Sequence, residues 1–144
     1  MSQKLDRALW DIAIWHRNQV DLHGDPYILH LLRVAADVSR DNYDEETVIV
    51  ALLHDILEDT ECPPKHILDT YGADIADAVE AMTKRQSDGP YAEYICNKVA
   101  NSKRAVAVKK ADLRDNMLPW RSVLNGQKQK LYPEALKYLE GLSA

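Results

Sequence analysis

Cysteine is scarce in this sequence. Only Cys62 and Cys96 occur among 144 residues, and they are too far apart to form a Cys-x-x-Cys pair. Disulfide-rich domains and zinc knuckles need several cysteines at short, regular spacings. The sequence therefore predicts two ordinary reduced thiols and argues against a disulfide framework or a cysteine-based zinc site.

Long hydrophobic runs are also absent. No apolar stretch approaches the roughly 20 residues that a membrane-spanning helix needs. Residues 1–19 place charges among their apolar positions and lack the apolar segment, followed by small residues, that marks a secretory signal. We therefore expect no signal peptide, no membrane partner and a cytoplasmic location.

The chain has no excess of positive charge. Lysine and arginine total 18 against 23 aspartate and glutamate residues, which gives a formal net charge of −5. Proteins that bind nucleic acid or anionic membranes usually carry a basic surface instead. A small-molecule substrate fits this composition better than nucleic acid.

What the sequence does contain is helical periodicity, interrupted by short breakers. Asp44 before two glutamates is typical of a helix N-terminus, and Gly72 of a helix end. The alternation Ala-Val-Ala-Val at 105–108 could belong to a strand, but its flanks are helical and we interpret it as helix. The pattern predicts one helix that ends before 24–26, one that carries His30, one from 44 to about 60, and further helices over about 64–71, 73–83, 91–101, 102–118 and 133–141.

This pattern predicts an all-α fold, a compact orthogonal helical bundle with a site between helices. A length of 144 residues suits one domain, 1–144, that buries roughly two thirds of its unfolded surface. No internal repeat, low-complexity tract or linker divides it. The C-terminal helix at about 133–141 would cover the core or support a homo-oligomer.

The segment ALLHDILEDT, from Ala51 to Thr60, joins an apolar run to four ionisable side chains. On a helix of 3.6 residues per turn, Glu58 lies four positions after His54. Asp59 follows Asp55 by the same step, so all four side chains share neighbouring stripes of one face. Ionisable groups that continue a buried helix need a partner that offsets desolvation, and a divalent cation is the strongest one. The segment predicts part of a metal site.

Two further candidate ligands lie on apolar helices of their own. His30 stands in PYILHLLRVAADV, and Asp112 stands in AVKKADLRDNML. Imidazole and carboxylate ligands without thiolate suit manganese, iron, zinc or magnesium, and leave coordination positions for water or substrate. We expect one divalent metal held by His30, His54, Asp55 and Asp112.

Other interpretations of these residues remain open. His54 and Asp55 could be a polar pair at a helix end, and Asp112 could pair with Lys109 or Arg114. Glu58 and Asp59 could be solvated carboxylates at a helix C-terminus, although negative charge there opposes the helix dipole.

The chain resembles the HD-domain metal-dependent phosphohydrolases. The likeness is greatest to the hydrolase domain of RelA/SpoT-type enzymes and the small metazoan SpoT homologue, which remove the 3′-diphosphate from (p)ppGpp. The motifs lie in the family's order and cover about residues 10–120. The segments that carry the resemblance are GDPYILH (24–30), ALLHDILEDT (51–60), YG (71–72), MTK (82–84) and KKADLRDN (109–116).

The resemblance implies a metal bound by the four candidate ligands, with manganese as the first choice because the family's alarmone hydrolases use it. It also implies that Glu58 and Asp59 position or deprotonate the attacking water, and that Asn116 lies beside the nucleotide. We name four further candidates for contact with the substrate. Arg17 and Lys84 could meet phosphates, His23 could do so when protonated, and Tyr27 could stack on a base.

Two departures from the family pattern bear on the substrate. Asp21 and Leu22 occupy positions where alarmone hydrolases commonly carry basic residues, and Leu31 replaces the usual proline after the first metal-binding histidine. We expect a carboxylate at Asp21 to repel a polyphosphate rather than bind it.

The leading hypothesis is a metal-dependent phosphohydrolase that acts on a nucleotide, most simply a (p)ppGpp 3′-pyrophosphohydrolase, with Glu58 and Asp59 as general base and orienting group. An HD-type nucleoside monophosphate phosphohydrolase would keep the same ligands and need less basic surface. A non-catalytic nucleotide-binding module is a third possibility, but the intact Glu58 and Asp59 argue against it.

Overall fold

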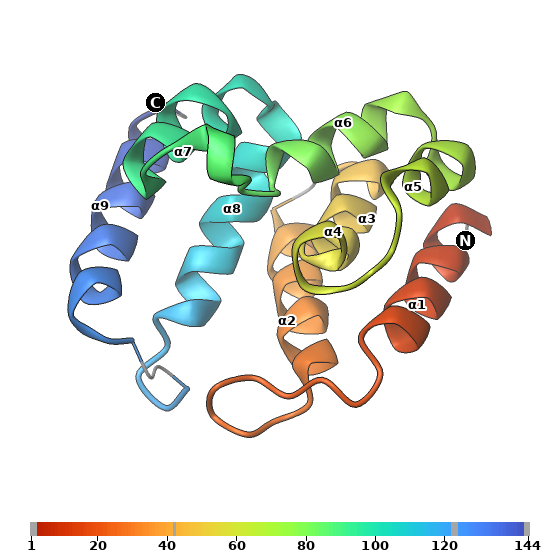
Figure 1. The fold of residues 1–144 in the computed structure, drawn as a ribbon, viewed down its shortest axis with the longest axis horizontal. Coiled ribbons are helices and arrows are strands. Elements are labelled where there is room, and N and C mark those ends of the chain that lie inside the picture. Colours follow the sequence, from red (N-terminus) through yellow and green to blue (C-terminus); the bar gives the residue numbers. More distant parts are fainter. Residues whose placement is uncertain (1–2, 42, 122–123, 143–144) are drawn as a thin grey trace.

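A computed structural model of the protein describes residues 3–41, 43–121 and 124–142 (Figure 1). These residues contain helices and connecting loops but no strand, apart from one isolated antiparallel bridge between Val20 and Pro26. The all-α prediction is confirmed. The helices are α1 (Gln3–Trp15), α2 (Tyr27–Arg40), α3 (Glu45–Leu53), α4 (Ile56–Asp59), α5 (Pro64–Tyr71), α6 (Ala73–Ala81), α7 (Tyr91–Asn97), α8 (Lys103–Asn116) and α9 (Gly126–Leu142), with short 3-10 turns η1 (Gln86–Asp88) and η2 (Val99–Asn101).

Helix α3 is the centre of the core. Its residues 49–53 are all buried, and so is Thr47. A helix that is apolar on all sides has to be enclosed by other elements, and α1, α2, α6 and α8 pack against it. The side chain of Asp44 accepts a hydrogen bond from the Thr47 backbone N–H at 2.9 Å, which confirms the predicted helix start.

Helices α2 and α8 bring distant parts of the chain to the C-terminal end of α3. They pack against each other and against α3, and Figure 1 shows α8 between α9 and α2. His30 lies in the first turn of α2, and Asp112 lies toward the end of α8. Their shared contact with α3 places both residues near His54.

The C-terminal helix begins earlier than its sequence suggests. We predicted a helix over about 133–141, but α9 spans Gly126–Leu142 with Pro133 inside it. Proline lacks the N–H that a helix interior needs, so its usual place is the first turn, and we took it for the start. Helix α9 packs against α7 and α8, and its buried residues, Ala135 and Leu139, both follow Pro133.

A second predicted helix is interrupted. We expected continuous helix over 91–101, but α7 ends at Asn97 and Lys98 adopts φ −118° and ψ −61° before η2 begins. The Lys98 ammonium donates hydrogen bonds to the Glu80 carboxylate at 3.0 Å and to the Asp88 carboxylate at 2.9 Å. The break at Gly72 lies where it was predicted, and the φ of 91° at this residue ends α5.

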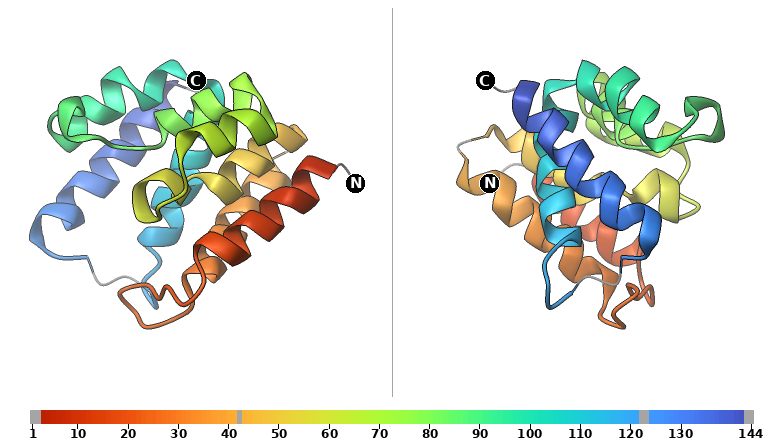
Figure 2. Two further views of the ribbon diagram at one scale, coloured as in Figure 1. Left: turned by 45° about the vertical axis from the view of Figure 1, so that its right-hand side comes forward. Right: turned by 90° about the vertical axis from the view of Figure 1, so that its left-hand side faces the viewer.

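The loop between α1 and α2 lies at the same end of the molecule as the segment that follows α8, as both views of Figure 2 show. Gly24, with φ 96°, allows the sharp turn in this loop. Among the described residues, no helix is long and apolar enough to cross a membrane.

Candidate metal centre

The helix that carries His54 and Asp55 breaks at these two residues. We predicted continuous helix through this segment, but α3 ends at Leu53, α4 begins at Ile56, and the two residues between them form a turn. Successive side chains of a regular helix point about 100° apart. The turn, in which Asp55 has φ −104° and ψ 2°, instead lets both side chains face one point.

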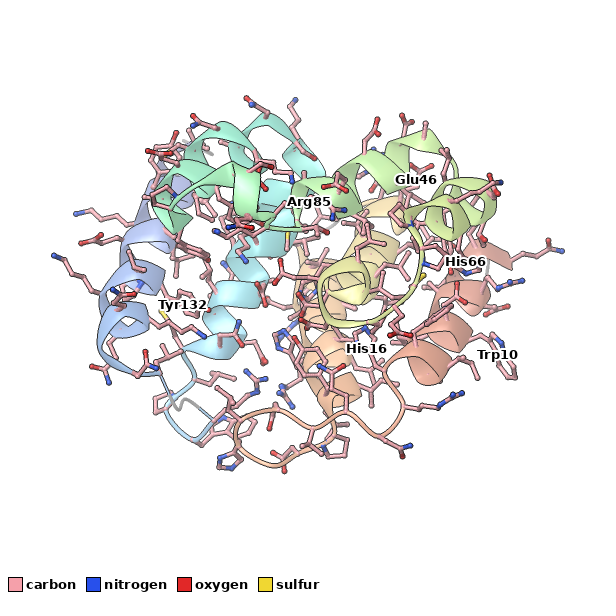
Figure 3. All side chains as sticks on the ribbon, in the orientation of Figure 1. Trp10, His16, Glu46, His66, Arg85 and Tyr132 are labelled. Atoms are coloured by element: carbon pink, nitrogen blue, oxygen red, sulfur yellow. The ribbon has the colours of Figure 1, made fainter. Side chains whose placement is uncertain are left out.

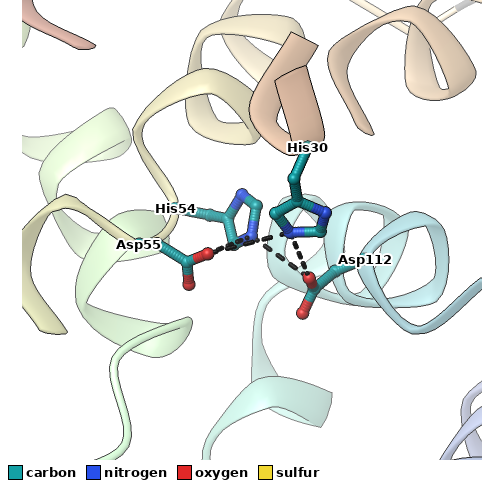
Figure 4. Close-up of side chains that lie close together, drawn as sticks. All are labelled: His30, His54, Asp55 and Asp112. Atoms are coloured by element: carbon teal, nitrogen blue, oxygen red, sulfur yellow. Dashed lines mark hydrogen bonds and ion pairs between the residues drawn. The ribbon is translucent and has the colours of Figure 1, made fainter. Parts of the chain in front are cut away.

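The four predicted ligands converge at that point (Figure 4). One ligand atom from each of His30, His54, Asp55 and Asp112 lies within 4.8 Å of the others. His54 Nε2 is 3.1 Å from Asp55 Oδ2 and 3.3 Å from Asp112 Oδ1. His30 Nε2 is 3.0 Å from Asp112 Oδ1. Both histidines and Asp112 are buried.

The ring nitrogens of His54 fit a metal ligand. Nδ1 contacts the backbone carbonyl of Ala51 at 2.6 Å, so it carries the hydrogen. Nε2 points into the cluster, where it is buried without a hydrogen-bond partner. A buried polar atom without a partner calls for an explanation, and a metal ion at the cluster would supply one.

The charges at the centre favour a cation. Burial alone would raise the pKa of Asp112, but the nearby Lys109 and His54 outweigh burial and hold this pKa well below its usual range. Burial would lower the pKa of His54, but Asp55 and Asp112 raise it well above its usual value. The carboxylates thus favour a nearby positive charge. A bound divalent cation would supply that charge while both imidazoles stay neutral.

The alternative pairing of Asp112 with Lys109 is present alongside the cluster. Lys109 Nζ lies 3.1 Å from Asp112 Oδ2, whereas Oδ1 faces the histidines. Arg114, the other partner we considered, pairs with Asp37 at 3.2 Å. The two oxygens of Asp112 can therefore serve a metal and the lysine together.

A cavity of about 370 Å³ opens over the cluster, a volume in the range of small-molecule sites. Carboxylates of the cluster lie at its floor, and lysine, arginine and tyrosine side chains form part of its wall. The lining residues are Gln19, Val20, Asp21, Leu22, His23, Tyr27, Asp55, Glu58, Asp59, Lys109, Asp112, Asn116, Arg121, Leu124, Lys128 and Tyr132.

Glu58 and Asp59, the predicted catalytic pair, both line this cavity. Glu58 Oε1 accepts a hydrogen bond from the Lys84 backbone N–H at 2.7 Å, which fixes its carboxylate. Burial, and then the charge of Asp55, raise the pKa of Glu58. Burial, followed by Asp55 and Glu58, raises the pKa of Asp59 to about 6. Carboxylates with raised pKa values suit proton transfer near neutral pH.

Two of the predicted substrate-binding residues contact the metal cluster directly. The Tyr27 hydroxyl donates a hydrogen bond to Asp55 Oδ2. Asn116 Nδ2 donates to Asp112 Oδ1 at 3.1 Å, and its Oδ1 accepts from Arg121 at 2.7 Å. Both residues also line the cavity, where a substrate would meet them.

The structure does not bring all the predicted substrate-binding residues together. His23 lines the cavity, but Arg17 is exposed and borders a separate hollow. Lys84 contributes its backbone N–H to Glu58, and its side chain is not among the described residues that line the cavity. Neither position could be told from sequence, because both residues lie in loops whose paths depend on the packing of the helices around them.

Asp21 lines the cavity, but its carboxylate already has partners within the protein, and its repulsion of a polyphosphate stays a prediction. Its Oδ1 accepts hydrogen bonds from the backbone N–H groups of His23 at 2.9 Å and Asp25 at 3.0 Å. Its Oδ2 lies 3.2 Å from the Arg121 guanidinium. Asp21 therefore fixes the shape of the loop between α1 and α2, residues 16–26, which we call the entrance loop, and its charge is offset by Arg121.

Sequence reasoning missed Arg121, Lys128 and Tyr132 in the cavity wall. Figure 3 shows the Tyr132 side chain on α9, facing α8. The missed start of α9 concealed Lys128 and Tyr132, whose spacing of four residues places them on one helix face. Basic residues thus line the cavity from the segment after α8 and from α9, although the loop between α1 and α2 lacks them.

An all-helical bundle in which two histidines converge with two aspartates that line a cavity defines a class of metal-binding hydrolase fold. The family described as HD domain matches residues 8–123. The chain belongs to this family.

Several relatives share the fold or the sequence. The chain is 31% identical over 122 residues to a guanosine-3′,5′-bis(diphosphate) 3′-pyrophosphohydrolase of Aquifex aeolicus, a match that covers 81% of this chain and 18% of that protein. It is 33% identical over 97 residues to a probable enzyme of the same name from Mycoplasma genitalium, covering 67% and 14%. The chain therefore spans less than a fifth of these curated relatives.

A solved structure is similar along nearly the whole chain. It is described as a metazoan orthologue of SpoT that hydrolyses ppGpp and plays a role in starvation responses. The TM-score is 0.80 at 25% sequence identity, and the match covers 99% of this chain and 86% of the other. The likeness includes α9, which lies beyond the residues that the family matches.

Proposed function

We propose that the protein is a metal-dependent phosphohydrolase that removes the 3′-diphosphate of (p)ppGpp. The observation that carries this proposal is the convergence of His30, His54, Asp55 and Asp112 beside a cavity that the two aspartates line together with Glu58. The names of the relatives support the substrate, since they describe ppGpp hydrolysis by those proteins.

We propose that the four converging side chains hold one divalent cation. When bound, the cation supplies polarisation of a phosphate oxygen and lowers the pKa of the attacking water. Nitrogen and carboxylate ligands without thiolate suit manganese, which we propose over iron, zinc or magnesium.

The chain's own residues would then orient the substrate and move the proton. Glu58, fixed by the Lys84 backbone, would accept the proton of the attacking water, with Asp59 beside it as the orienting group. The water oxygen would bond to the phosphorus on the ribose 3′ oxygen as that P–O bond breaks, which releases pyrophosphate, and the 3′ oxygen would take up the proton to leave as a hydroxyl. Lys109, Arg121 and Lys128 line the cavity and would offset the charge of the diphosphate.

A substrate screen tests this function. The manganese-loaded protein should release pyrophosphate from ppGpp, because the cavity carries both the cluster and basic side chains. Release of phosphate and pyrophosphate is measured for a panel that includes ppGpp and nucleoside monophosphates. Turnover of monophosphates alone would favour the nucleoside monophosphate phosphohydrolase, and tight ppGpp binding without turnover would favour the binding module.

Leu22 offers a test of the entrance loop. This side chain is 78% exposed and lines the cavity, whereas Asp21 must stay because it shapes the loop. Leu22→Lys should raise kcat/KM for ppGpp relative to a nucleoside monophosphate by about 1.4- to fivefold, since an exposed ion pair contributes roughly 0.2–1 kcal/mol. The gain should be larger at low salt.

Steady-state kinetics with both substrates at two salt concentrations measure this effect. Leu68→Lys is the matched control, because Leu68 is an exposed leucine on α5 outside the cavity. An unchanged preference in Leu22→Lys would mean that the entrance loop does not reach the phosphates.

A further inference from the structure

His30 is held from the side opposite the metal cluster. Its Nε2 faces Asp112 at 3.0 Å, and its Nδ1 lies 2.6 Å from Asp115 Oδ2. Asp115 is 6% exposed, although its place three residues after Asp112 gave no sign of a role in the sequence. The two histidines of the cluster therefore differ, since His54 Nδ1 contacts a backbone carbonyl.

Asp115 is itself fixed by two arginines. Arg33 Nε lies 2.8 Å from Asp115 Oδ1, and its terminal nitrogen lies 3.2 Å from Oδ2. Arg121 approaches Oδ2 at 3.4 Å. The Arg33 guanidinium in turn lies over the Trp120 ring, 5.3 Å from its centre. Two-pronged contact with an arginine favours the ionised carboxylate and fixes its plane.

An ionised carboxylate decides which nitrogen of a neutral imidazole carries the hydrogen. It can only accept, so the ring has to donate from Nδ1. The lone pair of His30 Nε2 then points into the cluster. Such a partner orients the ring of a metal-binding histidine and strengthens Nε2 as a ligand.

We propose that Asp115 is a positioning residue that holds His30 in the Nδ1–H form and thereby sets the affinity of the cluster for its cation. This inference rests on metal binding within the proposed function but does not depend on which nucleotide is hydrolysed. It assigns to the Arg33–Asp115 pair a role in the site as well as in joining α2 to α8.

Asp115→Asn tests the role with little change in shape. The amide has no charge to share with Arg33, and its nitrogen cannot accept from His30 when it faces Nδ1. The dissociation constant for Mn²⁺, measured by calorimetric titration of metal-free protein, should rise about 10- to 100-fold. Thermal unfolding of the metal-free proteins reports any general loss of stability.

Asp37→Asn is the matched control. Asp37 on α2 pairs with Arg114 on α8 at 3.2 Å, so this variant also loses an ion pair between the same two helices. Neither residue of this pair belongs to the metal cluster. The Mn²⁺ affinity of Asp37→Asn should stay within about twofold of the wild type, in the range of exposed ion-pair effects.

Three results would overturn the role of Asp115. They are wild-type Mn²⁺ affinity in folded Asp115→Asn, equal losses in both variants, and a wild-type protein that binds no Mn²⁺. If Asp115→Asn does not fold, the titration is made on Asp115→Glu, whose longer side chain keeps the charge but displaces the carboxylate from Nδ1. Wild-type affinity there would also contradict the role. Metal binding without nucleotide turnover would overturn only the proposed function.

Discussion

His54→Ala is expected to lower the affinity for divalent metal by at least roughly tenfold, so that the purified protein contains little metal. His54 Nε2 is buried in the cluster without a hydrogen-bond partner and lies within 3.3 Å of two carboxylates. Alanine removes this nitrogen ligand and leaves the cation with His30, Asp55 and Asp112 alone. Elemental analysis of the protein as purified, and after dialysis against Mn²⁺, measures the loss.

His66→Ala is the control for this experiment. His66 is also a histidine with an aspartate partner, since its Nε2 lies 3.0 Å from Asp11 Oδ2, but it lies outside the cluster. It should keep the wild-type metal content. If His54→Ala retains as much metal as the wild type, the assignment of the centre is wrong.

Glu58→Gln should bind metal as the wild type does and lose most of its turnover. The amide preserves the shape of the side chain and can still accept from the Lys84 backbone N–H. It cannot take a proton from water. General base catalysis contributes roughly two to four orders of magnitude in rate, so kcat should fall by about that factor. Steady-state kinetics, with metal content measured on the same samples, separate the two effects.

Glu61→Gln is the matched control, because Glu61 is an exposed glutamate just after α4 and does not line the cavity. It should retain wild-type kcat. A fall of less than tenfold in Glu58→Gln would place Glu58 at the edge of the chemistry. Asp59→Asn would then be the next variant to measure, since Asp59 lines the same cavity.

The helix boundaries that depend on neighbouring residues could be predicted from sequence. Asp44 caps α3 through a side chain three residues from its partner, and Gly72 ends α5 through its own backbone angle. Such signals act within one turn of chain. The start of α9 could not be predicted, because proline usually stands in the first turn of a helix, whereas Pro133 lies inside this one.

The break between α3 and α4 shows the same limit. Helical spacing was sufficient to suggest that His54 and Asp55 act together. In the structure, however, their side chains converge because these two residues form a turn between α3 and α4. No glycine or proline marks this break in the segment 51–60. The turn depends on the packing around α3, whose neighbours enclose it on every side.

The sequence by itself determined the all-α fold and the identity of the four side chains that converge, because apolar periodicity and the spacing of His and Asp residues are properties of the chain. Only the tertiary structure decided which side chains surround them. The contact of His30 with Asp115 joins residues 85 positions apart, and Asp21 meets Arg121 across two loops. Such pairs form only when packed helices bring distant segments together, so their roles cannot be inferred from local sequence.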